Sequence, residues 1–159
     1  MATTIDALQI VTFAVAGDLF ATDIFSVERV LRYQAPRPVP NTPPWLLGVI
    51  DYQDRVVPVL DIRARFEVPP AAATSATRIL VFEVDEQWVA ALVDSVQEVV
   101  TIARSDIEAP PDLFRGLTKD YLLGLLRRPK GVVIVLDARK LFTSHERLVL
   151  EQVSGGTNV

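Results

Sequence analysis

The stretch GVIDYQDRVVPVLDIRARF, residues 48–66, recurs in altered form as GLLRRPKGVVIVLDARKLF at residues 124–142. Aligned without gaps, the two stretches share Gly48/Gly124, Val56/Val132, Val57/Val133, Val59/Val135, Leu60/Leu136, Asp61/Asp137, Arg63/Arg139 and Phe66/Phe142. Strand propensity accounts for the shared valines but not for the shared glycine, aspartate, arginine and phenylalanine. The repetition therefore predicts two copies of one structural unit, rather than two unrelated valine-rich strand pairs.

A second block repeats upstream of the first, in the same order. FAVAGDLFATDIFSVERVL, residues 13–31, aligns with FEVDEQWVAALVDSVQEVV, residues 82–100. The coincident positions are Phe13/Phe82, Val15/Val84, Ala21/Ala90, Ser26/Ser95, Val27/Val96 and Val30/Val99. We therefore expect repeat units of about 8–66 and 78–142, joined by the low-complexity bridge EVPPAAATSAT, with the functional surface where the copies meet.

Composition excludes several classes of protein. The 159 residues suffice for one ordinary domain or two very small ones, and the net charge of −4 provides no basic field for nucleic acid. The sequence has no run of about 18 apolar residues and no signal peptide, so we expect a cytoplasmic protein without direct membrane insertion. Zero cysteines exclude disulfides, zinc–thiolate sites and thiol nucleophiles.

Short apolar strands separated by turn signals predict an all-β fold. Two small β-barrels packed together fit the duplication, and a single sandwich is the alternative. Gly17-Asp18 and Asp54-Arg55 are expected at hairpin turns. Each copy is too small to bury a good core alone, so apolar residues should fill the seam between the copies. The capping sequence TSHE at 143–146 predicts a short C-terminal helix.

Nothing in the sequence supports catalysis. His145, the one histidine, lies in the capping sequence and is expected to be solvated. Asp61 and Asp137 recur before short turns, so we expect them to cap those turns rather than to act as a catalytic pair. No nucleotide-binding, hydrolase or calcium-binding motif is present, and we expect no cofactor and no metal site. The protein is predicted to be a binding module rather than an enzyme.

VERVLRYQAPRPVPNTPPWLLGVIDYQDRVVPVLDIRARF, residues 27–66, resembles the signature region of CheW-like domains. ILVFEVDEQWVAALVDSVQEVV and YLLGLLRRPKGVVIVLDARKLF are similar to the rest of that domain, so the resemblance runs from about Leu8 to Leu150. It implies two five-stranded, SH3-like barrels packed together, with a short C-terminal helix. The expected domain covers residues 7–152, with flexible tails at 1–6 and 153–159.

The resemblance also implies a function. CheW-like adaptors join bacterial chemoreceptors to the histidine kinase CheA, so we expect a non-catalytic scaffold located at receptor arrays on the inner face of the membrane. The expected partners are the regulatory domain of a CheA-type kinase and the cytoplasmic tip of a methyl-accepting chemoreceptor. A rival from another class is a small-molecule-binding or enzymatic barrel that uses the cleft between the barrels.

The resemblance places two partner surfaces on this chain. The receptor-binding groove maps onto Val27, Val30, Val96 and Val99, although these valines could instead be core residues. The surface that docks the kinase maps onto Arg29, Tyr33, Asp51, Tyr52, Gln53, Asp54 and Arg55.

Two positions depart from the family pattern. Arg29 stands where a Glu is common, and Gln53 stands where an Arg is common. These changes leave open a divergent adaptor of another chemosensory system, such as twitching motility, that binds only one of the two partners.

Overall fold

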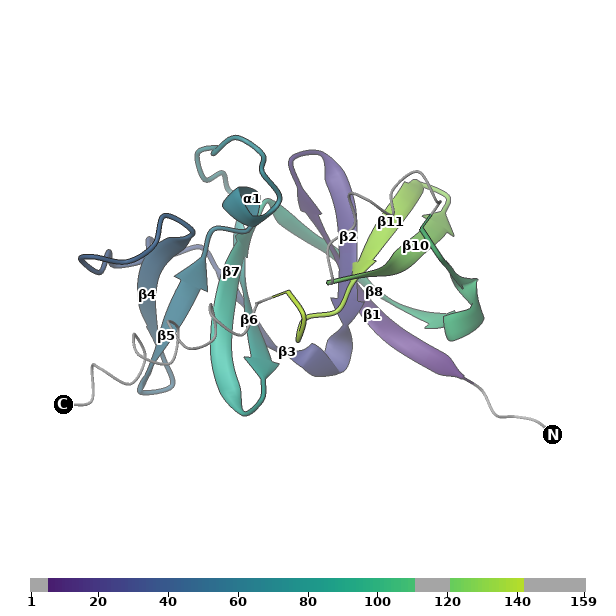
Figure 1. Cartoon of the computed structure of the whole chain (residues 1–159), viewed down its shortest axis with the longest axis horizontal. Coiled ribbons are helices and arrows are strands. Elements are labelled where there is room, and N and C mark those ends of the chain that lie inside the picture. Colours follow the sequence, from purple (N-terminus) through teal and green to yellow (C-terminus); the bar gives the residue numbers. More distant parts are fainter. Residues whose placement is uncertain (1–5, 111–120, 142–159) are drawn as a thin grey trace.

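The computed structural model describes residues 6–110 and 121–141, which form two β-sheets and one short helix (Figure 1). The first sheet has the strand order β8-β1-β2-β11-β10-β9, and the second has the order β3-β6-β7-β5-β4. The strands are β1 (Ala7–Val15), β2 (Asp18–Asp23), β3 (Val27–Arg32), β4 (Leu46–Tyr52), β5 (Arg55–Leu60), β6 (Arg78–Val84), β7 (Gln87–Val93), β8 (Ser95–Ala103), β9 (Ile107–Glu108), β10 (Leu122–Arg128) and β11 (Gly131–Leu136). The α-helix α1 spans Ile62–Arg65, and the 3₁₀ turns η1 and η2 span Ile24–Ser26 and Arg104–Asp106.

Each sheet takes strands from both repeats. The first hairpin of the first repeat, β1–β2, joins strands β8 to β11 of the second repeat. The first hairpin of the second repeat, β6–β7, joins strands β3 to β5 of the first repeat. Replacing each strand by its repeat equivalent converts the order β3-β6-β7-β5-β4 into β8-β1-β2-β11-β10. The repeats are therefore related by a pseudo-twofold arrangement in which they exchange their leading hairpins.

Three apolar clusters hold the two sheets together. The first-barrel cluster comprises Leu8, Ile10, Ala21, Ile102, Leu126, Val133 and Val135. The second-barrel cluster comprises Ile50, Tyr52, Val57, Val59, Ile79, Val81 and Ala90. The central cluster comprises Phe13, Val15, Phe20, Leu46, Leu60, Ile62, Leu80, Phe82, Val84, Val89, Ala91, Val93, Tyr121, Leu136, Ala138 and Leu141.

Alternation along the strands divides side chains between these clusters. On β6, Ile79 and Val81 belong to the second-barrel cluster, whereas Leu80 and Phe82 belong to the central cluster. A strand that is buried on both faces has to be apolar at almost every position, as β6 is. A single sandwich would have one core between its sheets. The three clusters instead confirm the prediction of two packed barrels with an apolar seam.

Two-residue hairpin turns require backbone with positive φ. The turn between β1 and β2 is Ala16-Gly17, with φ of 54° and 84°. The turn between β4 and β5 is Gln53-Asp54, with φ of 50° and 62°. Both turns lie one residue earlier than the sequence predicts, because Asp18 and Arg55 already pair as strand residues. Asp54 thus adopts the left-handed conformation, which Asp tolerates better than most residues.

The shared glycine of the repeat lies where a connector crosses a strand. Gly48 lies within β4, and a Cβ added to Gly48 would lie 2.7 Å from the carbonyl carbon of Arg37. At Gly124 an added Cβ would lie 2.5 Å from the carbonyl oxygen of Glu108. Arg37 and Glu108 bridge to repeat-equivalent partners, Val49 and Leu125. Both connectors therefore pass so close to a strand that only glycine fits.

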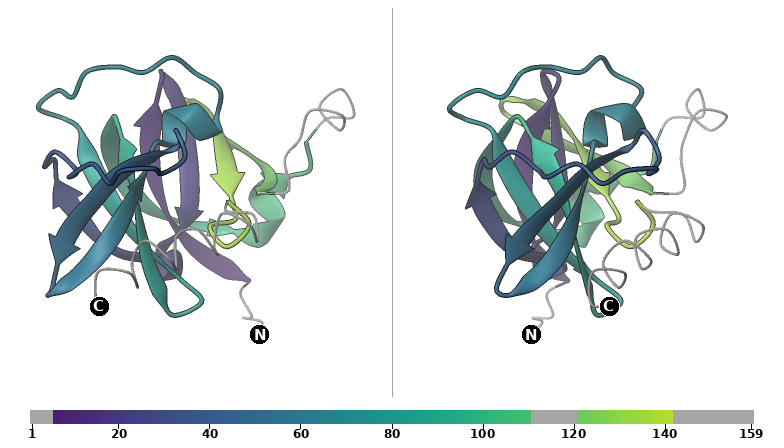
Figure 2. Two further views of the ribbon diagram at one scale, coloured as in Figure 1. Left: turned by 60° about the vertical axis from the view of Figure 1, so that its left-hand side comes forward. Right: turned by 90° about the vertical axis from the view of Figure 1, so that its left-hand side faces the viewer.

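The all-β prediction is confirmed by the two sheets, and α1 is the expected short turn after Asp61. The 67–77 bridge forms an exposed loop that arches over one end of the molecule (Figure 2). The predicted C-terminal helix and His145 lie outside the described residues. The domain limits 7–152 and the tails remain predictions.

Candidate functional site

The four valines assigned to the receptor groove lie on two equivalent edge strands, β3 and β8. Val27 pairs with Phe82 across β3 and β6, and Val96 pairs with Phe13 across β8 and β1. Because Phe13 and Phe82 are repeat equivalents within the central cluster, the two strands begin at matching places on the seam.

The four valines differ in exposure. Val27 and Val96 are half-buried and pack against the central cluster. Val30 is 38% exposed and Val99 is 52% exposed. The leading pair of the two strands thus contributes to the core, while the following pair presents apolar surface to solvent. Val27 and Val96 therefore have a packing role, whereas Val30 and Val99 are accessible to a partner, and the groove assignment itself stays a prediction.

Of the residues assigned to kinase docking, Asp51 to Arg55 form the tip of the β4–β5 hairpin and Arg29 lies on β3. Tyr33 follows β3 and lines a separate pocket with Leu47 and Asp61. Asp51, Gln53, Asp54 and Arg55 are exposed, as are Arg29 and Tyr33. The exception is Tyr52, a residue that is only 9% exposed and belongs to the second-barrel cluster. Alternation explains the difference, because Ile50 and Tyr52 point inward on β4 while Asp51 points outward.

Tyr52 connects the hairpin to the edge strand β3. Its hydroxyl donates a hydrogen bond to Glu28 Oε2 at 3.3 Å and accepts one from Gln53 Nε2 at 3.2 Å. The β3–β6 register shifts between Val27 and Arg29, at the position of Glu28. The acidic group that faces the hairpin is therefore Glu28 rather than residue 29. Sequence comparison with the family pattern missed Glu28, because the shifted register is visible only in the structure.

A cation–π contact extends this cluster onto β7. The guanidinium carbon of Arg55 lies 3.9 Å from the centroid of the Trp88 ring. The rings of Trp88 and Tyr52 have centroids 5.1 Å apart. Trp88 belongs to the second repeat, so sequence reasoning did not place it beside a hairpin of the first repeat. The exchange of hairpins brings it there.

The repeated aspartates act as caps, as the sequence predicts. Asp61 Oδ1 accepts hydrogen bonds from the backbone N–H groups of Arg63 (3.1 Å) and Ala64 (3.3 Å). Asp137 Oδ1 accepts one from the N–H of Arg139 at 2.9 Å. The repeated Arg63 also forms an ion pair with Asp94 at 2.7 Å, which ties α1 to the start of β8. The two aspartates therefore have the same structural role in both repeats.

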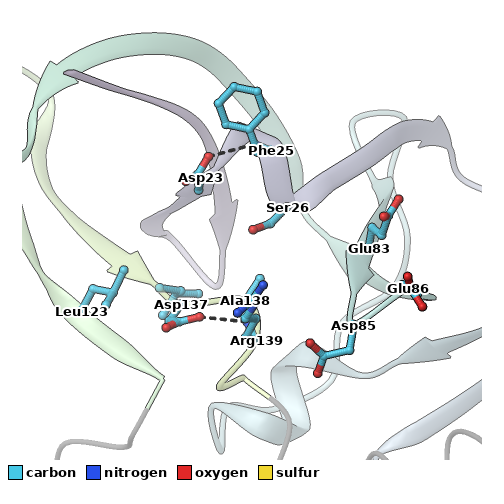
Figure 3. Close-up of a pocket in the computed structure, with 11 residues that line it drawn as sticks. Asp23, Phe25, Ser26, Glu83, Asp85, Glu86, Leu123, Asp137, Ala138 and Arg139 are labelled. Atoms are coloured by element: carbon cyan, nitrogen blue, oxygen red, sulfur yellow. Dashed lines mark hydrogen bonds between the residues drawn. The ribbon is translucent and has the colours of Figure 1, made fainter. Parts of the chain in front are cut away.

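A pocket of about 800 Å³, which the sequence did not reveal, lies between η1, the β6–β7 turn and the end of β11 (Figure 3). Its lining includes Asp23, Glu83, Asp137 and Arg139, and beside them Phe25 is 87% exposed. Asp23 accepts a hydrogen bond from the Phe25 N–H at 2.9 Å, and Asp137 caps the following turn. Two of its carboxylates therefore shape the backbone at the rim of the pocket.

Within residues 6–110 and 121–141, no three histidine, cysteine or acidic side chains come together as a metal-binding group. The same described ranges contain no helix with the length and apolar character needed to span a membrane. The pKa of Arg127 is raised by its hydrogen bond to Glu108, and this pair lies at the surface of the first sheet.

Two packed barrels with exchanged hairpins, an exposed valine on each equivalent edge strand and a charged hairpin on one side define a double-barrel binding module. A family model described as the CheW-like domain matches residues 9–146. The chain belongs to the CheW-like domain family.

Relatives in this family cover most of the chain. The chemotaxis protein CheW of Treponema pallidum (strain Nichols) is 27% identical over 150 residues, which is 92% of this chain and 88% of that protein. The chemotaxis protein CheW of Bacillus subtilis (strain 168) is 32% identical over 130 residues, covering 82% and 83% of the two proteins. Protein FrzA of Myxococcus xanthus is 27% identical over 127 residues, covering 78% and 79%.

A solved structure shares the same fold. The crystal structure of the scaffolding protein TtCheW from Thermoanaerobacter tengcongensis superposes with a TM-score of 0.76 and 26% sequence identity. The match covers 87% of this chain and 94% of that one. The similarity thus extends over both barrels.

Proposed function

We propose that this protein is a chemosensory adaptor, a scaffold that couples chemoreceptors to a CheA-type histidine kinase. Membership of the CheW-like domain family supports this function, as do the relatives named chemotaxis protein CheW and the solved scaffolding protein TtCheW. We assign no catalytic step, because the recurring aspartates are engaged as caps in both repeats. The working location is the cytoplasm, at receptor arrays on the inner face of the membrane.

One observation supports the receptor-binding part of the proposal. Val30 and Val99 are repeat equivalents, both are exposed, and each follows a valine that packs against the central cluster. An exposed apolar side chain on each of two equivalent strands suits a receptor tip that lays an apolar helical face against both barrels. The receptor groove is therefore assigned to Val27, Val30, Val96 and Val99, with Val30 and Val99 as its solvent-facing contacts.

The test replaces Val30 or Val99 by aspartate in the full-length protein. Each change should reduce co-sedimentation with receptor-containing membranes by roughly tenfold or more, since a buried charge at the centre of an interface is expensive. Because both side chains are exposed, circular dichroism and the melting temperature should change little.

Val132→Asp is the matched control, because Val132 on β11 is 52% exposed but lies outside the assigned groove. Full receptor binding by the Val30 and Val99 variants would refute the groove assignment. Equal loss of binding by all three variants would also refute it, since the effect would then be general.

The proposed kinase-docking surface consists of the exposed tip of the β4–β5 hairpin together with Arg29 and Tyr33. The alternative, an adaptor of another chemosensory system that retains one partner, is tested by separate pull-downs with receptor and with kinase. Retention of both partners eliminates it.

A further inference from the structure

The open end of the second barrel carries an arginine stacked on a tryptophan. Arg55, Val57 and Val59 alternate onto the inner side of β5, as Trp88 and Ala90 do on β7. Val57, Val59 and Ala90 fill the barrel core. Trp88 lies at its edge, and the guanidinium of Arg55 covers the indole ring at 3.9 Å.

This stacking leaves the hydrogen-bonding capacity of Arg55 unused. Arg55 is exposed, and within the described part of the chain its guanidinium has no hydrogen bond or ion pair in addition to the ring contact. A guanidinium that is held by one face still presents its N–H donors at the edges, in a fork that matches a carboxylate. The arginine is thus fixed in position and has donors available for a ligand.

The stack is supported from three strands. Trp88 on β7 packs against the ring of Tyr52 on β4, with 5.1 Å between centroids. The Tyr52 hydroxyl is held by Glu28 on β3 and by Gln53 at the hairpin turn. Because the platform is ordered before a partner arrives, little side-chain entropy is lost when the arginine binds.

The equivalent end of the first barrel lacks this arrangement. The residues equivalent to Trp88 and Arg55 are Leu19 and Gly131. The two barrels share their core pattern, with Ile10, Ala21 and Val133 matching Ile79, Ala90 and Val57. The first barrel packs its core without an arginine–tryptophan pair, so the pair is not required for barrel packing. It distinguishes the second barrel from the first.

We propose that Arg55, positioned by Trp88, binds a carboxylate on the regulatory domain of the kinase and is a specificity determinant of that interface. This inference rests on the proposed function and names the chemistry of one contact in it. The exposed carboxylates of Asp51 and Asp54 share the hairpin with Arg55, so a multiply charged anion such as phosphate would be repelled. A single carboxylate from an acidic side chain carries less charge and is repelled less, while it still matches the fork of the guanidinium donors.

The experiment measures binding of the full-length protein to the kinase's regulatory domain by calorimetry, at two salt concentrations. Arg55→Ala should weaken binding roughly tenfold and make it less sensitive to salt, because one ion pair is lost. Trp88→Leu, which installs the residue of the other barrel, should weaken binding several-fold in the presence of Arg55 and hardly at all in the Arg55→Ala background. Trp88→Phe keeps a ring under the guanidinium and should restore most of the affinity.

Arg127→Ala is the matched control, since Arg127 is an exposed arginine on the other barrel that already pairs with Glu108. Failure of the unaltered protein to bind the regulatory domain would refute the proposed function itself. If the unaltered protein binds and Arg55→Ala binds equally well, the contact proposed here is refuted and the adaptor function stands. Additive effects of the Arg55 and Trp88 changes would likewise refute the positioning role of Trp88.

Discussion

Thr22 illustrates how one side chain can oppose the stability of the fold that surrounds it. It is 2% exposed on β2, and its hydroxyl has no hydrogen-bond partner in the described structure. The repeat-equivalent position is Ala91, which belongs to the central cluster. A buried hydroxyl without a partner loses its hydration without compensation.

Replacing Thr22 by valine should therefore stabilise the protein by about 1 kcal/mol, because the shape is kept while the unsatisfied hydroxyl is removed. The free energy of unfolding from urea titrations measures the change. Thr12→Val is the contrasting variant. The Thr12 hydroxyl donates to the carbonyl of Glu98 and accepts from its N–H, so its loss should destabilise by about 1–2 kcal/mol. A destabilised Thr22→Val protein would show that the hydroxyl has a partner.

At the scale of secondary-structure elements, both long connectors fold back on the strand that follows them. The proline-rich connector bridges Arg37 to Val49 with reciprocal N–H···O bonds of 2.8 and 2.9 Å. The other connector forms β9, whose Glu108 pairs with Leu125. Prolines prevent the first connector from forming a long strand, but a single bridge needs only one residue with a free N–H.

The glycine at each crossing should be irreplaceable. Gly48→Ala and Gly124→Ala should each destabilise the protein by roughly 2–3 kcal/mol, since the added methyl group collides with connector backbone that cannot rotate away. Gly17→Ala is the control, because an added Cβ there meets nothing within 4 Å. Its cost should be about 1 kcal/mol, from the left-handed backbone alone. Equal melting temperatures for all three variants would contradict the crossing argument.

At the scale of the whole molecule, the exchange of hairpins makes the two repeats mutually dependent. Strand β2 pairs with β11 of the other repeat, and β5 pairs with β7. The central cluster also draws on both repeats, for example through Phe13 and Phe82. Neither repeat by itself contains a complete barrel sheet, so each needs the other to fold.

A protease site inserted between Ala72 and Ala73 tests this dependence. These residues lie in the exposed 67–77 loop, so cleavage should leave a folded complex of two fragments that elute together (Figure 2). Each purified fragment should be unfolded alone by circular dichroism, and mixing the fragments should restore the β-sheet spectrum. Two fragments that are separately folded would contradict the exchange.

Several features followed from residue order and local chemistry alone. The repeated blocks predicted duplication, the alternation of apolar residues predicted strands, and Asp61 and Asp137 predicted caps, because each of these depends on neighbours within a few residues. The recurrence of Gly48 as Gly124 indicated a position that requires glycine. The sequence did not show the reason, which is the connector that crosses the strand there. The resemblance of residues 27–66 pointed to the CheW-like family that the comparisons confirm.

Only the tertiary structure decided which repeat contributes which strand to each barrel. The types of strand pairing and the apolar pattern are the same whether a leading hairpin joins its own repeat or the other repeat. The sequence pattern therefore cannot distinguish the two arrangements. It also decided that Tyr52 is buried, that Glu28 rather than residue 29 faces the hairpin, and that Trp88 supports Arg55. These contacts join residues that lie far apart in the chain, and their geometry depends on how two sheets curl and pack rather than on local propensity.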